Sequence, residues 1–220
     1  LSLLSLQFNN LSGLIPPPIW NISSLKGLSV VGNALSGTIP AGAFANLPLL
    51  QLFYMSYNQF HGHVPAILAN SSELQRIELG YNFFSGTVPP EVGGLQNLES
   101  LALSNNLLQA TTPSDWNFMS TLSNCSQLQY LDLASNELGG MLPSSISNLS
   151  TSLVYLSLSR NRIVGNIPER IGNLFQLQVL SLENNLLTGT LPSSLSILTN
   201  LGDLSLGKNN LSGSVLLTIG

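Results

Sequence analysis

The chain is poor in charged residues. Asp, Glu, Lys and Arg make up 7% of its 220 residues, whereas an average globular protein has roughly a quarter. Only six residues are Lys or Arg, and the formal net charge is −4, so the sequence offers no basic stripe for a nucleic acid. No apolar run reaches the roughly 18 residues that a membrane helix needs. The composition therefore disfavours a nucleic-acid partner and a membrane span within these residues.

Residues that carry catalysis or bind metals are also scarce. His61 and His63 are the only histidines, and no cysteine or carboxylate lies near enough in sequence to complete a zinc site. We expect both to be solvated loop residues at a bend. The single Cys125 cannot form an internal disulfide, and we expect a buried apolar residue rather than a reactive thiol. No phosphate loop or dinucleotide fingerprint occurs. The sequence thus predicts no enzyme, no catalytic residue, no metal and no cofactor.

The feature that recurs is a leucine pattern with a fixed asparagine. Residues 177–192, LQVLSLENNLLTGTLP, fit L-x-x-L-x-L-x-x-N-x-L-x-G-x-[LIV]-P. Aligning on the asparagine gives nine copies, which begin at Leu1, Leu25, Leu50, Leu74, Leu98, Leu128, Leu153, Leu177 and Leu201. The steps are 24 or 25 residues, except for one of 30 over residues 98–127. Because repeats stack rather than enlarge one core, residues 1–220 are predicted to form one leucine-rich-repeat domain.

Each part of the repeat has a physical role. The L-x-x-L-x-L segment alternates with a period of two, which predicts a short strand with its leucines pointing inward. The asparagine follows where the chain turns away, and its amide can both donate to and accept from backbone groups of neighbouring turns. We expect a buried structural ladder of Asn9, Asn33, Asn58, Asn82, Asn106, Asn136, Asn161, Asn185 and Asn209. The glycine marks a bend, the proline closes an extended piece at an edge position, and a short helix returns the chain.

The G-x-[ILV]-P extension, as in residues 40–65, resembles the plant-specific class of leucine-rich repeats. That resemblance implies an α/β solenoid of about nine repeats, a right-handed superhelix or horseshoe. Its concave face would be a parallel β-sheet, and its convex side would carry 3-10 or other short helices.

Two repeats depart from the pattern. The fifth has Ala110 in place of glycine and is followed by six additional residues that include Trp116, which predicts a longer helix or a bulge with Trp116 packed beneath it. The ninth reads SGSVLLTIG, with Leu216 in place of proline, and stops within the repeat. Solenoids need polar caps, and neither end has a capping sequence, so we expect a fragment of a longer array without a membrane helix or kinase.

Two stretches carry a narrower resemblance. Residues 115–128, with Asp115, Trp116 and Phe118, and residues 141–174 resemble ectodomains of plant receptor-like kinases of the immune-receptor subfamily, the flagellin-receptor and rice bacterial-blight-resistance-receptor type. The resemblance implies a peptide or microbial protein ligand, a co-receptor kinase ectodomain as second partner, and a membrane-anchored parent at the extracellular face of the plasma membrane. One alternative is a secreted inhibitor similar to polygalacturonase-inhibiting proteins, which the 30-residue step disfavours. Another is a purely structural or ice-binding solenoid, which the mixed Tyr, Arg and Glu side chains of the concave face disfavour.

Glycosylation sequons support an extracellular location. Four N-x-[ST] motifs share one position in the repeat, four or five residues before the first leucine of the next repeat. They predict N-glycans at Asn21, Asn70, Asn124 and Asn148. Asn10 and Asn210 are weaker candidates, because each directly follows a ladder asparagine.

The open positions between the strand leucines form the candidate ligand-binding face. Most are Ser, Gly or Ala, which let a ligand backbone come close. Two clusters rich in Tyr and Arg, the types enriched at binding hot spots, stand out: Tyr54, Tyr57, Arg76, Glu78 and Tyr81, and Tyr130, Asp132, Tyr155 and Arg160. The competing interpretation is that these tyrosines merely cover neighbouring strands and that the charges pair locally.

Overall fold

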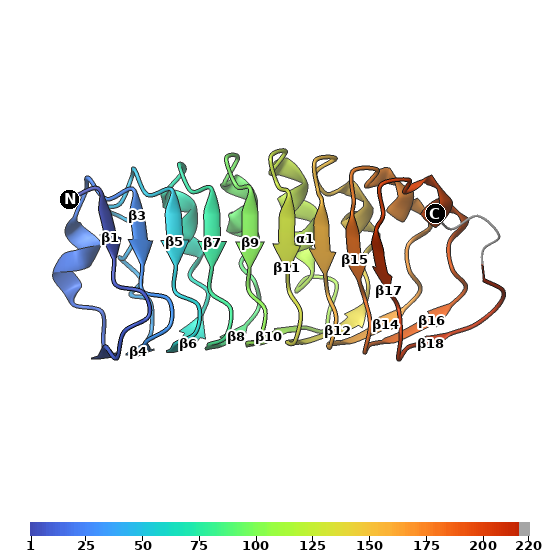
Figure 1. Ribbon diagram of the computed structural model, residues 1–220, viewed down its shortest axis with the longest axis horizontal. Helices are drawn as coiled ribbons and strands as arrows, with labels where there is room; N and C mark the ends of the chain where they lie inside the picture. The colour runs from blue at the N-terminus through green and yellow to red at the C-terminus, as the bar shows by residue number, and fades with distance from the viewer. Residues whose placement is uncertain (216–220) are drawn as a thin grey trace.

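The computed structural model describes residues 1–215, which form a stack of coils with one strand of each coil in a shared parallel sheet (Figure 1). These concave strands are β1 (Leu3–Ser5), β3 (Gly27–Ser29), β5 (Leu52–Tyr54), β7 (Arg76–Glu78), β9 (Ser100–Ala102), β11 (Tyr130–Asp132), β13 (Tyr155–Ser157), β15 (Val179–Ser181) and β17 (Asp203–Ser205). They pair in sequence order and in parallel. The predicted leucine-rich-repeat solenoid is confirmed.

A second sheet runs along another side of the stack, where the sequence predicted only extended pieces. Its order is the same as that of the first sheet. Its strands are β2 (Ser12–Gly13), β4 (Ala34–Gly37), β6 (Gln59–His63), β8 (Phe83–Gly86), β10 (Leu107–Ala110), β12 (Glu137–Met141), β14 (Arg162–Gly165), β16 (Leu186–Gly189) and β18 (Asn210–Leu211). The expectation that His61 and His63 lie in a loop is therefore wrong: both are exposed residues of β6. They pair with residues of β8, which extends the strand through the bend.

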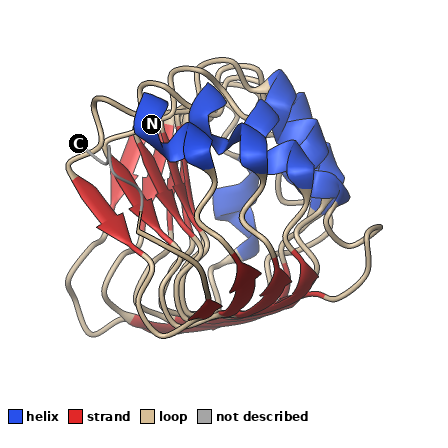
Figure 2. Cartoon of the chain, turned by 90° about the vertical axis from the view of Figure 1, so that its right-hand side faces the viewer, coloured by secondary structure: helices blue, strands red, loops and turns tan. Residues whose placement is uncertain are grey.

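Short helices form the side opposite the concave sheet (Figure 2). In the described part of the chain, seven are 3-10 helices and one is an α-helix: η1 (Pro17–Asn21), η2 (Ala66–Asn70), η3 (Pro90–Gly94), α1 (Asn117–Thr121), η4 (Leu122–Asn124), η5 (Ser144–Asn148), η6 (Glu169–Asn173) and η7 (Ser193–Ile197). The consensus proline directly precedes most of these helices, in an extended conformation. Its fixed φ thus sets the entry to the helix rather than an edge of a sheet. Within residues 1–215, no helix is both long and apolar enough to cross a membrane.

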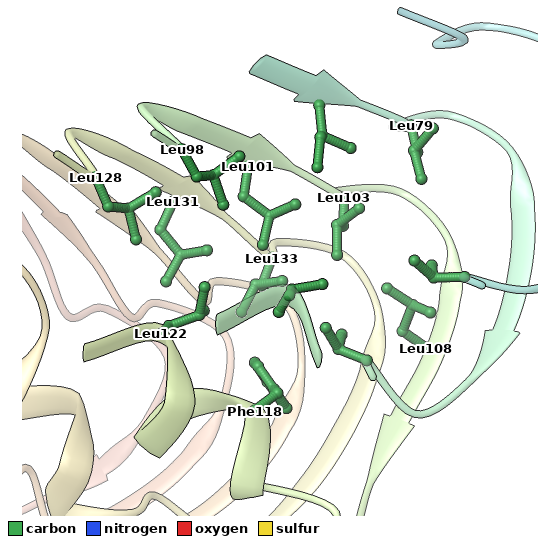
Figure 3. Packing of buried hydrophobic residues seen from close by; sticks show 14 of the residues in the cluster. Leu79, Leu98, Leu101, Leu103, Leu108, Phe118, Leu122, Leu128, Leu131 and Leu133 are labelled. Carbon is green, nitrogen blue, oxygen red and sulfur yellow. The ribbon is translucent and has the colours of Figure 1, made fainter. Parts of the chain in front are cut away.

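The core is a continuous column of leucine, isoleucine, valine and phenylalanine between the two sheets and the helices (Figure 3). Leu98 and Leu103 of one coil are fully buried, as are Leu128 and Leu133 of the next. Equivalent side chains therefore stack from coil to coil. Because every coil uses the same positions, the core holds the sheet in register but carries no recognition specificity.

The asparagine ladder forms as predicted from Asn33 onward, but the expectation that Asn9 is buried is wrong: it lies in the first coil of the stack and is exposed. Asn106 Nδ2 donates to the carbonyl of Leu103 in its own coil at 3.0 Å and to that of Leu79 in the preceding coil at 3.0 Å. Its Oδ1 accepts the backbone N–H of Phe84 at 2.9 Å. The same three-way pattern recurs at Asn58 and Asn161. Each amide thus closes a turn and ties it to the coil before it.

The consensus glycines lie at the predicted bend and have a left-handed backbone. Gly140 has a φ of +68°, and a Cβ there would lie 2.5 Å from the backbone oxygen of Thr111 in the preceding coil. Gly13 has a φ of +82°, but a Cβ there would meet nothing within 4 Å. Ala110 replaces this glycine in the fifth coil; it also ends its strand, β10, but it is not among the residues with a positive φ.

Gly140→Ala is expected to lower the free energy of unfolding by about 3 kcal/mol, because the left-handed backbone costs about 1–2 kcal/mol and backbone atoms must also move apart. Gly13→Ala, also at a left-handed φ but with open space around the Cβ, should cost only about 1–2 kcal/mol, the cost of the left-handed backbone. Urea unfolding of both variants measures the difference. Equal losses would show that the close approach at Gly140 contributes nothing.

The long step forms a longer helix, as predicted. Helix α1 runs directly into η4, and Trp116 lies under it, 2% exposed. The indole Nε1 donates to the carbonyl of Gly139 at 2.9 Å, and the ring stacks on Phe118 with a centroid distance of 5.6 Å. Asp115 Oδ2 accepts the backbone N–H groups of Thr111 and Thr112, which lowers the pKa of its carboxyl group. The irregular interval is therefore an ordered part of the stack. The predicted departure at Leu216 lies outside the described residues.

Cys125 is fully buried after η4, and burial raises the pKa of its thiol from 9.0 to about 11. Iodoacetamide at neutral pH should leave the folded chain unmodified and alkylate it in urea. Because the folded pKa is the higher one, this thiol's contribution to stability is complete below pH 8.5–9 and is lost as the pH rises toward about 11. Rapid alkylation of the folded chain at neutral pH would contradict this burial.

Candidate functional site

The concave sheet brings residues from distant parts of the chain into aligned rows. One row runs through Arg76, Ser100, Tyr130 and Tyr155, which are successive partners across β7, β9, β11 and β13. A second row runs through Tyr54, Glu78, Ala102 and Asp132. The long step does not disturb either row, because β9 and β11 pair directly. Side chains 30 residues apart in sequence are thus neighbours on one face.

A depression with a volume of about 440 Å³ lies over β7, β9 and β11. We call it the first hollow. The floor is made of small residues, among them Gly80, Ala102 and Ser104. The walls carry four of the predicted residues of the first cluster and one of the second, namely Tyr57, Arg76, Glu78, Tyr81 and Tyr130. Tyr54 does not line this hollow, but it is the register partner of Glu78 in the pairing of β5 with β7. The two sequence clusters therefore meet at one depression.

Tyr57 and Tyr81 form one wall. Their rings stack at a centroid distance of 4.1 Å with an interplanar angle of 12°, and the residues are 52% and 46% exposed. Both backbones are left-handed, with φ values of +57° and +54°. This conformation costs a non-glycine residue about 1–2 kcal/mol. The sequence carried a weak signal for it, since Gly32, Asn105 and Asn184, all tolerant of positive φ, occupy the same place before the ladder asparagine.

Charged side chains at the first hollow are unequally paired. Arg76 Nη2 lies 3.4 Å from Glu99 Oε2 in an exposed ion pair. Among the described residues, Glu78 forms no such pair. Burial raises the pKa of the Glu78 carboxyl group, and the nearby Arg76 guanidinium opposes that shift only in part. Glu78 is therefore a partly desolvated acidic group without an ion-pair partner among residues 1–215. Neither Glu99 nor Gln129, which also lines the hollow, was among the sequence candidates, because both lie just before their strands.

A second hollow of about 380 Å³ lies farther along the sheet. Asp132, Tyr155 and Arg160 of the predicted second cluster line it, together with Tyr81 and Glu183. Tyr155 stacks on Tyr130 at a centroid distance of 4.3 Å, and burial raises the pKa of the Tyr130 hydroxyl, which stays a neutral donor. Since Tyr81 lines both hollows, they form one furrow along the sheet.

The residues of the predicted glycosylation sites are exposed. The four sequon asparagines of the common phase end four of the short helices, at Asn21 (η1), Asn70 (η2), Asn124 (η4) and Asn148 (η5). Asn10 and Asn210, in loop and strand β18, are exposed as well. Glycans on the helix ends would leave the concave furrow free. Glycosylation itself stays a prediction.

In residues 1–215, no three His, Cys, Asp or Glu side chains come together as a metal site would require. The furrow offers instead aromatic faces, small polar groups and carboxylates. Such a surface is built for recognition.

Comparison with known proteins agrees with this geometry. The family model described as Leucine Rich Repeat matches residues 1–22, 127–149, 152–174 and 176–198. The fold is that of a leucine-rich-repeat solenoid, and the relatives found include plant receptor kinases. A stretch of 39 residues is 69% identical to the receptor kinase-like protein Xa21 of Oryza sativa subsp. japonica, and covers 18% of this chain and 4% of that receptor.

Solved structures extend the likeness over almost the whole chain. A TDR receptor matches with a TM-score of 0.90 and 33% identity, over 98% of this chain and 36% of the other. The Arabidopsis receptor kinase HAESA, solved with the peptide hormone IDA and the co-receptor SERK1, matches with a TM-score of 0.67 and 27% identity, over 96% of this chain and 42% of the other. A plant ice-binding protein matches with a TM-score of 0.82 and 27% identity, over 96% and 66%.

The chain thus spans less than half the length of these receptors. Its fold is that of the leucine-rich-repeat ectodomains of plant receptor kinases. The predicted plant receptor resemblance is confirmed at this level.

Proposed function

We propose that the chain is an extracellular ligand-recognition fragment of a plant receptor-like kinase and that it binds an extended peptide or a protein segment in its concave furrow. The observation that carries the proposal is the furrow itself, with two stacked tyrosine pairs over a floor of Gly, Ala and Ser. Aromatic anchors bury much area at little rotamer cost, and a small-residue floor lets a peptide backbone approach.

The partners and location follow from the same proposal. A neighbour of this fold was solved with a peptide hormone and a co-receptor together. We therefore include a peptide or microbial protein ligand, a co-receptor kinase ectodomain, and a position at the extracellular face of the plasma membrane in a membrane-anchored parent. Immune and peptide-hormone signalling are both compatible with this surface.

Two alternatives fit less well. An ice-binding face needs a flat and repetitive row of side chains, whereas one concave row here runs through Tyr54, Glu78, Ala102 and Asp132. A polygalacturonase-inhibitor-like protein would hold a stricter repeat length than the 30-residue step allows.

A selection experiment tests the proposal. A displayed library of random linear peptides is enriched on the 220-residue chain, and the enriched peptides are synthesised. Ala102→Trp should weaken their binding about tenfold or more, because Ala102 lies on the floor of the first hollow and a bulky ring there fills it. Glu91→Trp, an exposed position in η3, is the matched control and should have no effect. Peptides that bind Ala102→Trp as tightly as the parent chain would refute a concave site.

A further inference from the structure

The chemistry of the first hollow points to one kind of ligand side chain. We propose that the hollow binds an arginine or lysine side chain of an extended peptide, with Glu78 as its ion-pair partner and the rings of Tyr57, Tyr81 and Tyr130 around its aliphatic stem and cationic head. This inference rests on the proposed function, since it names the part of the peptide that the furrow selects.

The first argument is charge. Arg76 is already paired with Glu99 at 3.4 Å, whereas Glu78 forms no ion pair among residues 1–215. Glu78 is also about half-buried, and that burial disfavours its ionised form. A buried carboxylate is costly unless it is paired. A ligand cation that pairs with Glu78 supplies the missing partner, whereas a ligand anion would add a second uncompensated charge.

The second argument is the aromatic wall. The stacked pair of Tyr57 and Tyr81 stands on one side of the hollow, and Tyr130 lines it from β11. The faces of aromatic rings attract cations, and they attract guanidinium most often because it is planar and weakly hydrated. Arginine and lysine also have apolar stems that can lie along the rings while the head group reaches a carboxylate.

The third argument is space and surrounding charge. The small residues at Gly80, Ala102 and Ser104 leave room for a long side chain to reach the floor. Farther along the furrow, Asp132 and Glu183 outnumber Arg160. The furrow therefore continues with a carboxylate excess beyond the first hollow, in a chain whose net charge is −4. A peptide with one basic anchor and further basic or neutral residues fits this face.

Glu78→Gln is the variant that separates this inference from the proposed function. It keeps the size of the side chain and removes its charge. Peptides from the random library that bind the parent chain should be enriched in Arg or Lys, and their affinity for Glu78→Gln should fall about tenfold or more. Glu91→Gln makes the same change at an exposed position in η3, outside the concave furrow. For peptides anchored in the first hollow, this matched control should change affinity less than threefold.

A change in the peptide completes the test. Replacing the basic residue by citrulline, the neutral isostere of arginine, should weaken binding to the parent chain but have little further effect on Glu78→Gln, because the two changes remove the same ion pair. The free energy of unfolding of Glu78→Gln should equal or exceed that of the parent at neutral pH, since the substitution removes a desolvated charge. That result excludes unfolding as the cause of weaker binding.

The outcomes are distinct. One outcome is a set of peptides that lose binding to Ala102→Trp, carry no basic residue, and bind Glu78→Gln as tightly as the parent chain. That outcome overturns the basic-anchor inference but still supports recognition on the concave face. Acidic peptides that instead depend on Arg76 overturn it as well. Peptides that are insensitive to Ala102→Trp overturn the proposed function.

Discussion

Replacing Asn106 by alanine should lower the free energy of unfolding by about 3 kcal/mol, the largest loss expected from a single polar side chain of this protein. Its amide satisfies the carbonyls of Leu79 and Leu103 and the N–H of Phe84. All three backbone groups are inside the stack, where each unpaired group costs about 1–3 kcal/mol. Urea unfolding followed by circular dichroism measures the change.

Asn9→Ala is the matched control for this prediction. Asn9 has the same place in the first coil, but it is exposed and its Nδ2 donates only to the carbonyls of Leu6 and Gln7. Its loss should cost less than about 1 kcal/mol. Because Asn106 also ties its coil to the preceding one, a broadened transition would indicate that the stack unfolds in parts. An unfolding midpoint equal to that of the parent would refute the structural role of the ladder.

The second large effect is on binding. Tyr57→Ala and Tyr81→Ala should each weaken the binding of peptides selected on the parent chain by about 2 kcal/mol, or roughly 30-fold. Alanine keeps the same left-handed backbone, so the substitutions remove the ring without a new backbone cost. Because the rings stack on each other at 4.1 Å, the double variant should lose less than the sum of the two single losses. Binding to immobilised chain, measured by titration with each peptide, gives these values.

Phe175→Ala controls for the loss of an exposed aromatic residue. Phe175 is 47% exposed and follows η6, away from the concave strands. Phe175→Ala should leave the affinity for the selected peptides unchanged. Parent-like affinity in both tyrosine variants would remove the tyrosine wall from the binding site.

Repetition explains how much of the fold the sequence reveals. The ladder asparagines recur nine times and the bend glycines eight times, together with the strand leucines, so a chance match at one copy is outweighed by the others. Asn106 was assigned to the ladder from spacing alone, and its three bonds are those expected. The second sheet was not foreseen, because its strands are two to five residues long and their outward positions are mixed, as at His61 and Phe83.

The candidate site was predictable only in part. Alternation placed Tyr57, Glu78 and Tyr130 on the concave face, and the structure adds that they share one hollow. Which carboxylate Arg76 pairs with could not be read from alternation, because Glu99 lies one residue before its strand. The depth of the hollow and the ion-pair partners of its charged residues depend on how side chains of neighbouring coils are oriented. The repeat pattern of the sequence does not specify those orientations.

Mapping where a bound peptide touches the chain tests the central claim most directly. Selected peptides that carry a photo-reactive residue are cross-linked to the 220-residue chain, and the adducts are located by mass spectrometry. Concave recognition predicts adducts at the first hollow, on Tyr57, Tyr81 or Tyr130 and their neighbours in β7 to β11. Adducts confined to the second sheet, for example at the exposed residues Phe83 and Leu107, or to the helical side would contradict it.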